Sequence, residues 1–273
     1  MSSAMPHPGW EQHPCFSSGA RSRFGRIHLP VAPGCNIECA YCRREYDCAH
    51  ENRPGVTSRV IGPGEALERL ERALVDMPGI AVAAVAGPGD PFCEPERTLE
   101  TFERIRARNG KIALCVSSNG LNVKDHIPRL KELGVGFVTI TVNAIDSAVG
   151  ARLHLRAALG GREYLGLEAA ALLLSRQLEA VALLKEAGMA VKVNCVVVPG
   201  INEDHAVFVA ARMGRMGVDL LNFLPLLPVA GTALEGCSPP GEAVMGRLRH
   251  RAGRHVPQMR HCTRCRADAA GML

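Results

Sequence analysis

The sequence predicts an α/β fold, a partial barrel of the TIM type made of six strand–helix units with N- and C-terminal extensions. Short runs rich in β-branched residues alternate with longer stretches in which apolar residues recur at helical spacing, as in parallel strands joined by crossover helices. Six units, rather than the eight of a closed barrel, favour an open or partial one. A chain of 273 residues, 47% hydrophobic, is long enough for one large domain of this class.

Each expected strand or helix is assigned from this alternation between short β-branched runs and apolar residues at helical spacing. The expected strands are residues 26–31, 80–86, 111–117, 137–142, 190–198 and 218–224. The expected helices are residues 65–77, 95–109, 123–133, 166–187, 202–215 and 241–251. In the first helix, Leu67, Leu70 and Leu74 recur at helical spacing. We therefore expect a barrel over 26–251, an irregular N-terminal arm over 1–25 and a C-terminal tail over 252–273.

Side chains alternate between two faces along three of these strands. One face is apolar, with Val138 and Ile140 as examples. The other face carries Cys115, Ser117, Thr139, Thr141, Asn143, Lys192 and Asn194. We expect the apolar faces to pack beneath the helices and the polar faces to line the barrel interior, which indicates a bound polar ligand. Cys195 falls on the outer face and is expected to be an inert core thiol.

Composition argues against several classes of protein. The N-terminal segment has no apolar run, and no stretch of 18 apolar residues occurs elsewhere, so we expect a cytoplasmic protein without signal peptide or membrane anchor. The net charge is +5, and arginines gather in 247–266. That cluster is either a solvated face or a nucleic-acid contact. Because no aromatic residues interleave it for base stacking, we do not expect a nucleic-acid partner.

The segment 32–48 crowds four of the 11 cysteines into one loop after the first strand, where a reducing compartment favours metal ligands over disulfides. Cys35, Cys39 and Cys42 offer three thiolates. Three ligands leave one position of a [4Fe-4S] cluster open, since closed clusters take four. An open iron can bind the nitrogen and oxygen atoms of a substrate or cofactor. Zinc is the alternative, but zinc sites usually pair close ligands across a longer gap, which this spacing fits poorly.

This spacing, with Tyr41 just before the last cysteine, resembles the radical S-adenosylmethionine (SAM) superfamily. The resemblance implies that the three cysteines hold a [4Fe-4S] cluster whose free iron binds the amino and carboxylate groups of SAM. It also implies that the glycine-rich segment 86–91 holds the amino group of the cofactor; the alternative is a turn that ends the second strand. The candidate cofactor-binding residues are Tyr41, Gly87, Pro88, Gly89, Asp90, Asn119, Asn143, Lys192 and Asn194.

Five further thiols remain, besides Cys93, Cys195 and Cys237. They are Cys15, Cys48, Cys115, Cys262 and Cys265. These thiols are enough to hold two additional clusters with incomplete protein ligation. A cluster held by two or three protein groups can be released or fused, whereas four ligands would store it.

Several segments together resemble one family of this superfamily, the nitrogenase cofactor maturases NifB. They are HPC at 13–15, the cysteine segment at 26–48, ENRPGV at 51–56, AGPGDP at 86–91, SSNG at 117–120, VTITVNAID at 138–146, KVNCVVVPGIN at 192–202 and CTRCRADAAGML at 262–273. The resemblance implies a lyase- or transferase-type maturase. Such an enzyme joins two [4Fe-4S] substrate clusters, inserts a carbon from the methyl group of SAM, adds a sulfur, and releases the eight-iron precursor of the nitrogenase cofactor. Some members carry a C-terminal carrier domain, which we do not expect here.

The resemblance also implies which side chains hold the substrate clusters. It assigns Cys15 and Cys48 to one substrate cluster and Cys115, Cys262 and Cys265 to the other. His13 and His28 are either further iron ligands or hydrogen-bonding residues. Glu51 either caps a cluster iron or forms a salt bridge. Lys192 is either functional in the interior, where a buried lysine is costly, or exposed at a strand end.

Two other functions remain open at this point. One is a different radical SAM enzyme with auxiliary iron–sulfur clusters, acting on a nucleotide, a peptide or RNA. The other is a non-catalytic iron–sulfur scaffold, which would not need an α/β body with a polar interior. For a maturase, we expect as partners SAM, the iron–sulfur cluster donor and cofactor carrier proteins of nitrogenase assembly, and an electron donor such as a ferredoxin.

Overall fold

The central element of the fold is a curved, mostly parallel sheet. A computed structural model describes residues 7–273, and its main sheet has the strand order β10-β1-β3-β4-β5-β8-β9. The strands are β1 (Gly25–His28), β3 (Ile80–Val85), β4 (Ala113–Ser118), β5 (Val135–Thr141), β8 (Ala190–Val197), β9 (Leu220–Pro225) and β10 (Ala270–Gly271). From β1 to β9 every pairing is parallel. The edges β10 and β9 are not paired with each other in the described chain, so the barrel is partial, as predicted.

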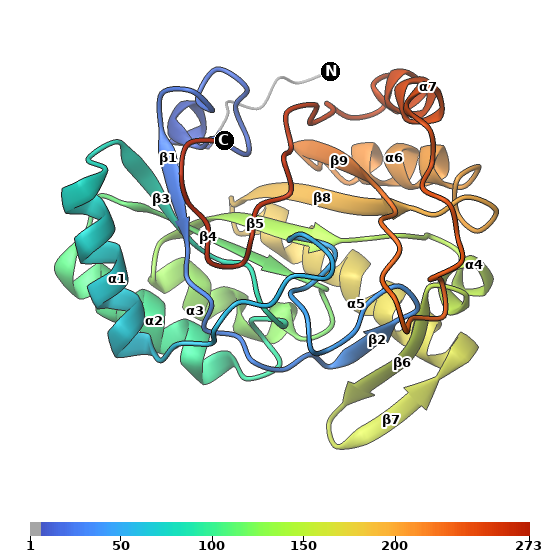
Figure 1. Ribbon diagram of the computed structural model, residues 1–273, viewed down its shortest axis with the longest axis horizontal. Coiled ribbons are helices and arrows are strands. Elements are labelled where there is room, and N and C mark those ends of the chain that lie inside the picture. The colour runs from blue at the N-terminus through green and yellow to red at the C-terminus, as the bar shows by residue number, and fades with distance from the viewer. Residues whose placement is uncertain (1–6) are drawn as a thin grey trace.

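Helices cover the outer face of this sheet (Figure 1). They are α1 (Pro63–Asp76), α2 (Pro95–Arg108), α3 (Ile127–Glu132), α4 (Ser147–Ala151), α5 (Gly166–Glu186), α6 (Ala206–Arg215) and α7 (Glu242–Ala252), with two 3-10 turns, η1 (Trp10–Gln12) and η2 (Val123–His126). The six expected helices are present. The short α4 was not expected; the Asp146 side chain caps it by accepting from the backbone of Ala148 and Val149. In the described residues, no helix is both long and apolar enough to cross a membrane.

The two faces of the sheet differ in chemistry as the alternation predicts. Val138 and Ile140 of β5 pack with Val191 of β8 in the core beneath the helices. Cys195 is fully buried in the same core, which confirms its expected place. On the opposite face, Lys192 lines a cavity inside the barrel. The polar interior predicted from the sequence is therefore present.

A second, antiparallel sheet was not predicted. It consists of β2 (Ile37–Cys39), β6 (His154–Leu159) and β7 (Arg162–Leu165), in that order. The cysteine segment expected to be a loop is thus partly a strand, held by its pairing with β6. The β6–β7 hairpin closes through Gly160 and Gly161, both at positive φ, the conformation that two-residue hairpin turns require.

The C-terminal segment lies against the barrel. It crosses in front of the sheet in Figure 1 and ends as β10, which pairs antiparallel with β1. The backbone N–H of His28 donates to the carbonyl of Ala269 at 2.8 Å, and His261 bonds the carbonyl of Pro14 at 2.9 Å. Part of the expected tail is therefore an edge strand, and it contacts the N-terminal arm. Residues 1–6 of that arm lie outside the described residues.

Candidate functional site

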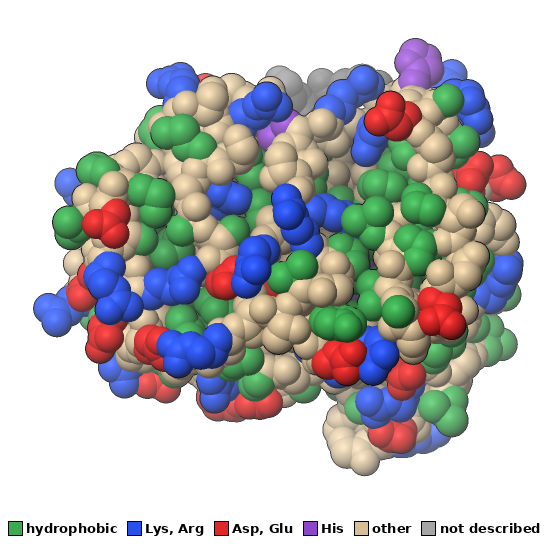
Figure 2. Space-filling model, viewed as in Figure 1, with side chains coloured by type: hydrophobic (Ala, Val, Ile, Leu, Met, Phe, Trp, Pro, Cys, Tyr) green, Lys and Arg blue, Asp and Glu red, His purple; other side chains and the backbone are tan. Residues whose placement is uncertain are grey.

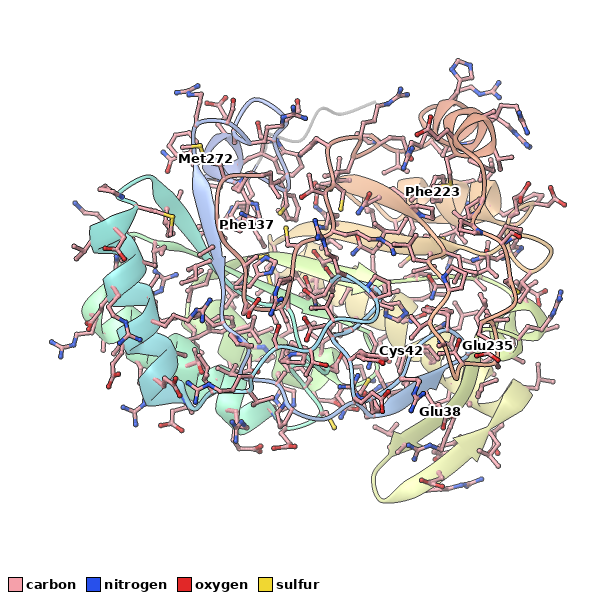
Figure 3. The ribbon with its side chains drawn as sticks, in the orientation of Figure 1. Glu38, Cys42, Phe137, Phe223, Glu235 and Met272 are labelled. Atoms are coloured by element: carbon pink, nitrogen blue, oxygen red, sulfur yellow. The ribbon has the colours of Figure 1, made fainter. Side chains whose placement is uncertain are left out.

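The three motif cysteines face one cavity. Cys35, Cys39 and Cys42 line it together with Cys48. Strand β2 sets the position of Cys39, whose register partner on β6 is His154. Figure 3 shows Cys42 beside Glu38 at the β2 end of the molecule. Among the described residues, no three His, Cys, Asp or Glu side chains converge on a single point suited to one metal ion.

The chemistry of this cavity suits cationic iron. Burial, followed by the nearby Asp90 carboxylate, raises the pKa of the Cys35 thiol to about 12. Burial and the neighbouring thiols likewise raise the pKa of Cys39 and Cys48. Thiolates at these positions therefore need a positive partner, which bound metal supplies. The three motif thiols, Cys35, Cys39 and Cys42, fit a [4Fe-4S] cluster with one iron left free.

The glycine-rich segment is locked against the start of the cysteine loop. A Cβ atom on Gly89 would lie 1.8 Å from the carbonyl oxygen of Gly34, so only glycine permits this approach. The backbone N–H of Gly89 donates to Ala32 at 2.7 Å, and that of Asp90 donates to Gly34 at 2.7 Å. Pro88 forms a parallel bridge with Ala32. The segment therefore holds Cys35 in place through its backbone.

Asp90 and Asn119 reach the same cavity. The Asp90 carboxylate accepts from the backbone N–H of Asn119 at 2.6 Å and from the Ser118 hydroxyl at 3.0 Å. The Asn119 amide nitrogen lies 3.7 Å from the Cys35 sulfur and donates to Asn36 at 2.7 Å. Asp90 and Asn119 thus line the cysteine cavity, whereas Gly87 and Pro88 contribute backbone. Their contact with SAM stays a prediction.

A second, narrow cavity of about 40 Å³ lies in the barrel interior and is lined by most of the remaining candidates. Its lining includes Cys15, Cys115, Cys262 and Cys265 together with His13, His28, Glu51, Lys192 and Asn194. They come from the arm, the loop after β2, β1, β4, β8 and the C-terminal tail. Cys48 lies in the other cavity, with Cys35, so the structure does not bring Cys15 and Cys48 together. Their assignment to one cluster stays a prediction.

Lys192 is buried, with 6% of its surface exposed, so the alternative of an exposed strand-end lysine is wrong. Burial lowers its pKa, but the charges of Cys15, Glu51, Cys262 and Cys115 together outweigh this effect, and the net direction is upward. In turn, burial raises the pKa of Cys15 to about 11 while Lys192 opposes the rise. Glu51 accepts from the Asn194 amide at 2.8 Å and forms no salt bridge within the described chain.

Burial lowers the pKa of both candidate histidines on this cavity, His13 and His28, which favours their neutral forms. Burial, followed by the Arg26 charge, lowers the pKa of His28 to about 4. Its Nδ1 donates to the carbonyl of Arg266 at 3.0 Å, which leaves Nε2 with a lone pair. The Nδ1 of His13 accepts from the backbone N–H of Cys15 at 3.2 Å, and its buried Nε2 has no partner within the described residues. Both rings are hydrogen-bonded, and their role as iron ligands stays a prediction.

His50 lines both cavities and was missed by the sequence analysis. Its Nε2 contacts the Tyr41 hydroxyl and lies 3.6 Å from the Cys39 sulfur. The amide of Asn143 donates to the Tyr41 hydroxyl at 2.7 Å. Tyr41 and Asn143 thus bind each other instead of lining either cavity. The signal for His50 was its place between Cys48 and the ENRPGV segment. His154, also 3.6 Å from Cys39, lies on the unpredicted β6 and gave no signal.

Comparison with known families agrees with this geometry. The model of the radical SAM superfamily matches residues 29–212, which include the cysteine motif and four parallel strands after it. This chain belongs to the radical SAM superfamily. Membership implies a [4Fe-4S] cluster and SAM as cofactors, and the cavity lined by Cys35, Cys39 and Cys42 has the donor set for that cluster.

Curated relatives match this chain over almost its whole length. The FeMo cofactor biosynthesis protein NifB of Chlorobaculum tepidum is 44% identical over 96% of this chain and 62% of its own length. The NifB of Klebsiella pneumoniae is 41% identical over 96% of this chain and 57% of its own length. The chain therefore spans roughly three fifths of these relatives. The predicted resemblance to NifB is confirmed.

Solved structures of radical SAM enzymes share the fold. Streptococcus suis SuiB bound to S-adenosylmethionine has a TM-score of 0.58 and 16% identity, covering 84% of this chain and 47% of SuiB. Methylornithine synthase PylB has a TM-score of 0.55 and 15% identity, covering 89% of this chain and 74% of PylB. At such identities the likeness concerns the fold alone, and it confirms the partial barrel.

Proposed function

We propose that this chain builds the eight-iron precursor of the nitrogenase cofactor. In this proposal it joins two [4Fe-4S] substrate clusters, inserts a carbide derived from the methyl group of SAM, and adds a sulfur. The similarity to NifB proteins, whose name refers to FeMo cofactor biosynthesis, supports the biological role. The observation that carries the chemistry is the barrel interior, where four thiols from distant segments line one cavity that meets the cysteine-motif cavity at His50.

The cavity lined by Cys35, Cys39 and Cys42 is called the motif cavity below, and its residues have distinct roles in this proposal. Cys35, Cys39 and Cys42 hold the resident [4Fe-4S] cluster, and the locked segment around Gly89 fixes the loop that presents them. When bound, this cluster supplies the electron that cleaves the sulfonium of SAM. Burial excludes water from Cys39, and His50 and His154 lie within reach of its sulfur. The site therefore keeps a reactive carbon fragment away from bulk solvent.

The interior cavity would hold the substrate clusters. Cys15, Cys115, Cys262 and Cys265 offer fewer thiols than two clusters with four ligands each would take. Incomplete ligation leaves iron faces free for fusion and lets the product leave. Buried Lys192 places a positive charge beside these thiols, which stabilises an anionic cluster.

The remaining expectations follow from this role and are also proposals. None of the cysteines, all of which lie within the described chain, forms a disulfide, in keeping with a reducing, cytoplasmic setting. The enzyme would receive clusters from a donor protein, pass its product to a carrier of nitrogenase assembly, and take electrons from a ferredoxin-like donor. Breaking a carbon–sulfur bond and transferring the carbon would make it a lyase- or transferase-type maturase.

Product analysis tests the proposal directly. Anaerobically reconstituted protein should hold about twelve irons in three clusters. With SAM and a reductant it should yield both 5′-deoxyadenosine and S-adenosylhomocysteine, and a ¹³C label on the methyl group of SAM should appear in the protein-bound iron–sulfur product. A scaffold would yield neither nucleoside. An ordinary radical enzyme would yield 5′-deoxyadenosine without S-adenosylhomocysteine, and that result would overturn the proposal.

A further inference from the structure

A groove on the surface leads to the barrel interior. It has a volume of about 640 Å³ and is lined in part by β9 and α7 residues, including Phe223 and Met245. Phe223, on β9, is labelled in Figure 3. Cys262 and Asn222 line both this groove and the interior cavity. The groove therefore meets the interior at a thiol.

Arginines dominate the charge of this groove. Arg53, Arg249, Arg260 and Arg264 line it, and Glu242 is the one acidic residue in its described lining. None of the four arginines belongs to an ion pair found within the described residues. Basic side chains are also visible near the centre of the face in Figure 2, where the C-terminal segment crosses in Figure 1. The groove thus carries a net positive charge.

Two of these guanidinium groups are held in place with donors unused. Arg264 is 9% exposed, and its Nη2 donates to the carbonyl of Pro225 while its Nε and Nη1 have no partner within the described residues. Arg249 donates from Nη2 to the carbonyl of Phe223 at 3.0 Å, and its Nε is likewise unpartnered. Buried charged donors without partners are costly, so this arrangement is suited to binding an anion.

The backbone of Arg264 gives independent support. It has a φ of 50°, a left-handed conformation that is unfavourable for a residue with a long side chain. The Arg53 side chain donates to the Arg264 carbonyl at 3.2 Å, and the backbone N–H of Arg53 donates to the Cys265 carbonyl at 3.1 Å. These bonds hold the residue between Cys262 and Cys265 with its guanidinium in the groove.

We propose that this groove is the passage through which anionic, thiolate-ligated iron–sulfur clusters enter and leave the barrel, with Cys262 as the first protein ligand they meet. This inference rests on the proposed function. The transfer is a ligand exchange without change of oxidation state. The bond between a cluster iron and one of the thiolates that the cluster carries breaks, and a bond between that iron and the Cys262 sulfur forms. The released thiolate takes up the proton that Cys262 loses. SAM is a poor occupant because the arginines repel its sulfonium.

Loading kinetics test the passage. Apoprotein with Cys35, Cys39 and Cys42 replaced by alanine, so that only interior sites bind, is mixed anaerobically with a synthetic [4Fe-4S] cubane carrying four small thiolates. Bound iron is counted against time. We compare the triple variant R53Q/R249Q/R260Q with R72Q/R215Q/R251Q, which removes the same charge from exposed arginines outside the groove. Circular dichroism checks that both variants fold.

The groove variant should load about tenfold more slowly at low salt, because it loses electrostatic attraction. The matched control should stay within about twofold of the parent. The difference should shrink at about 0.5 M salt, where screening is strong. R264K should load faster than R264Q, because it keeps the charge. Equal loading rates for groove and control variants, or a difference that salt leaves unchanged, would overturn the passage. Failure of the proposed function is distinguishable, because it appears as missing S-adenosylhomocysteine in the enzyme whose Cys35, Cys39 and Cys42 are intact.

Discussion

The Nε2 atom of His50 lies 3.6 Å from the sulfur of Cys39, while the same ring lines the barrel interior. His50 is therefore shared by the motif cavity and the cavity proposed for the substrate clusters. Burial, followed by the nearby His154, lowers the pKa of His50 to about 3, so the ring is neutral across the physiological range. It can act as a hydrogen-bonding partner without adding charge between the two cavities.

Replacing His50 should impair catalysis more than cluster binding. His50→Ala removes a partner of both Cys39 and the Tyr41 hydroxyl. Loss of such supporting bonds around a metal site typically costs roughly 10- to 100-fold in activity. We expect S-adenosylhomocysteine formation to fall by that amount, with iron content retained and the electron paramagnetic resonance spectrum altered. An unchanged spectrum and rate would show that His50 only fills space.

The buried thiols should divide into ligands and core residues. Cys39→Ala should lose about four irons per chain and all cleavage of SAM. Cys195→Ala is the matched control, because Cys195 is fully buried in the outer core. It should lower thermal stability slightly and leave the iron count unchanged. Iron loss in the Cys195 variant would contradict the assignment of the two faces of β8.

Interior thiols should be separable from the motif by product analysis. Cys262→Ala should lower bound iron by about four per chain while 5′-deoxyadenosine still forms, because Cys262 lies in the interior cavity. Cys48→Ala tests the open assignment. If Cys48 holds a substrate cluster, its variant behaves as the Cys262 variant does. If Cys48 serves the motif cavity that it lines, its variant loses 5′-deoxyadenosine as well.

Gly89 should not tolerate a side chain. In Gly89→Ala the added Cβ would meet the Gly34 carbonyl at 1.8 Å, so the glycine-rich segment and the cysteine loop must move apart. Overpacking of this kind costs about 1–3 kcal/mol of unfolding free energy, measurable by chemical denaturation, and should also lower cluster retention. Gly64→Ala in α1 is the control. Its Cβ meets nothing within 4 Å, and alanine favours a helix, so stability should hold or rise.

The sheet could be predicted from the sequence because one face of each strand is buried beneath helices, so apolar residues recur at every second position. Val138 and Ile140 face the helices while Thr139 faces the interior, and this alternation is legible in the residues themselves. The β6–β7 hairpin could not be found in this way. Its second strand is largely exposed, and Arg156 and Glu163 pair across it, so no apolar alternation marks it.

The interior cavity was foreseeable in part. Because side chains alternate between the two faces of β4 and β8, the sequence pattern places Cys115 and Lys192 inside the barrel. The position of Cys48 depends instead on the path of an irregular loop, set by a backbone bond from Cys48 to the Pro88 carbonyl at 2.8 Å. Such a bond between backbone groups cannot be predicted from the pattern of side chains. The edge strand β10 could not be predicted either, because it is only two residues long and too short to show an alternating pattern.

Strand β10 has a consequence for how the enzyme opens. Two register pairs, Arg26–Gly271 and Ile27–Ala270, join it to β1, and the Arg26 side chain donates to the Gly271 carbonyl. An element this short opens locally at a smaller free-energy cost than global unfolding. The residues that precede it carry Cys262 and Cys265. Local opening of β10 would therefore loosen the segment that carries these two interior thiols, so release of a bound cluster and access to the barrel interior would be coupled.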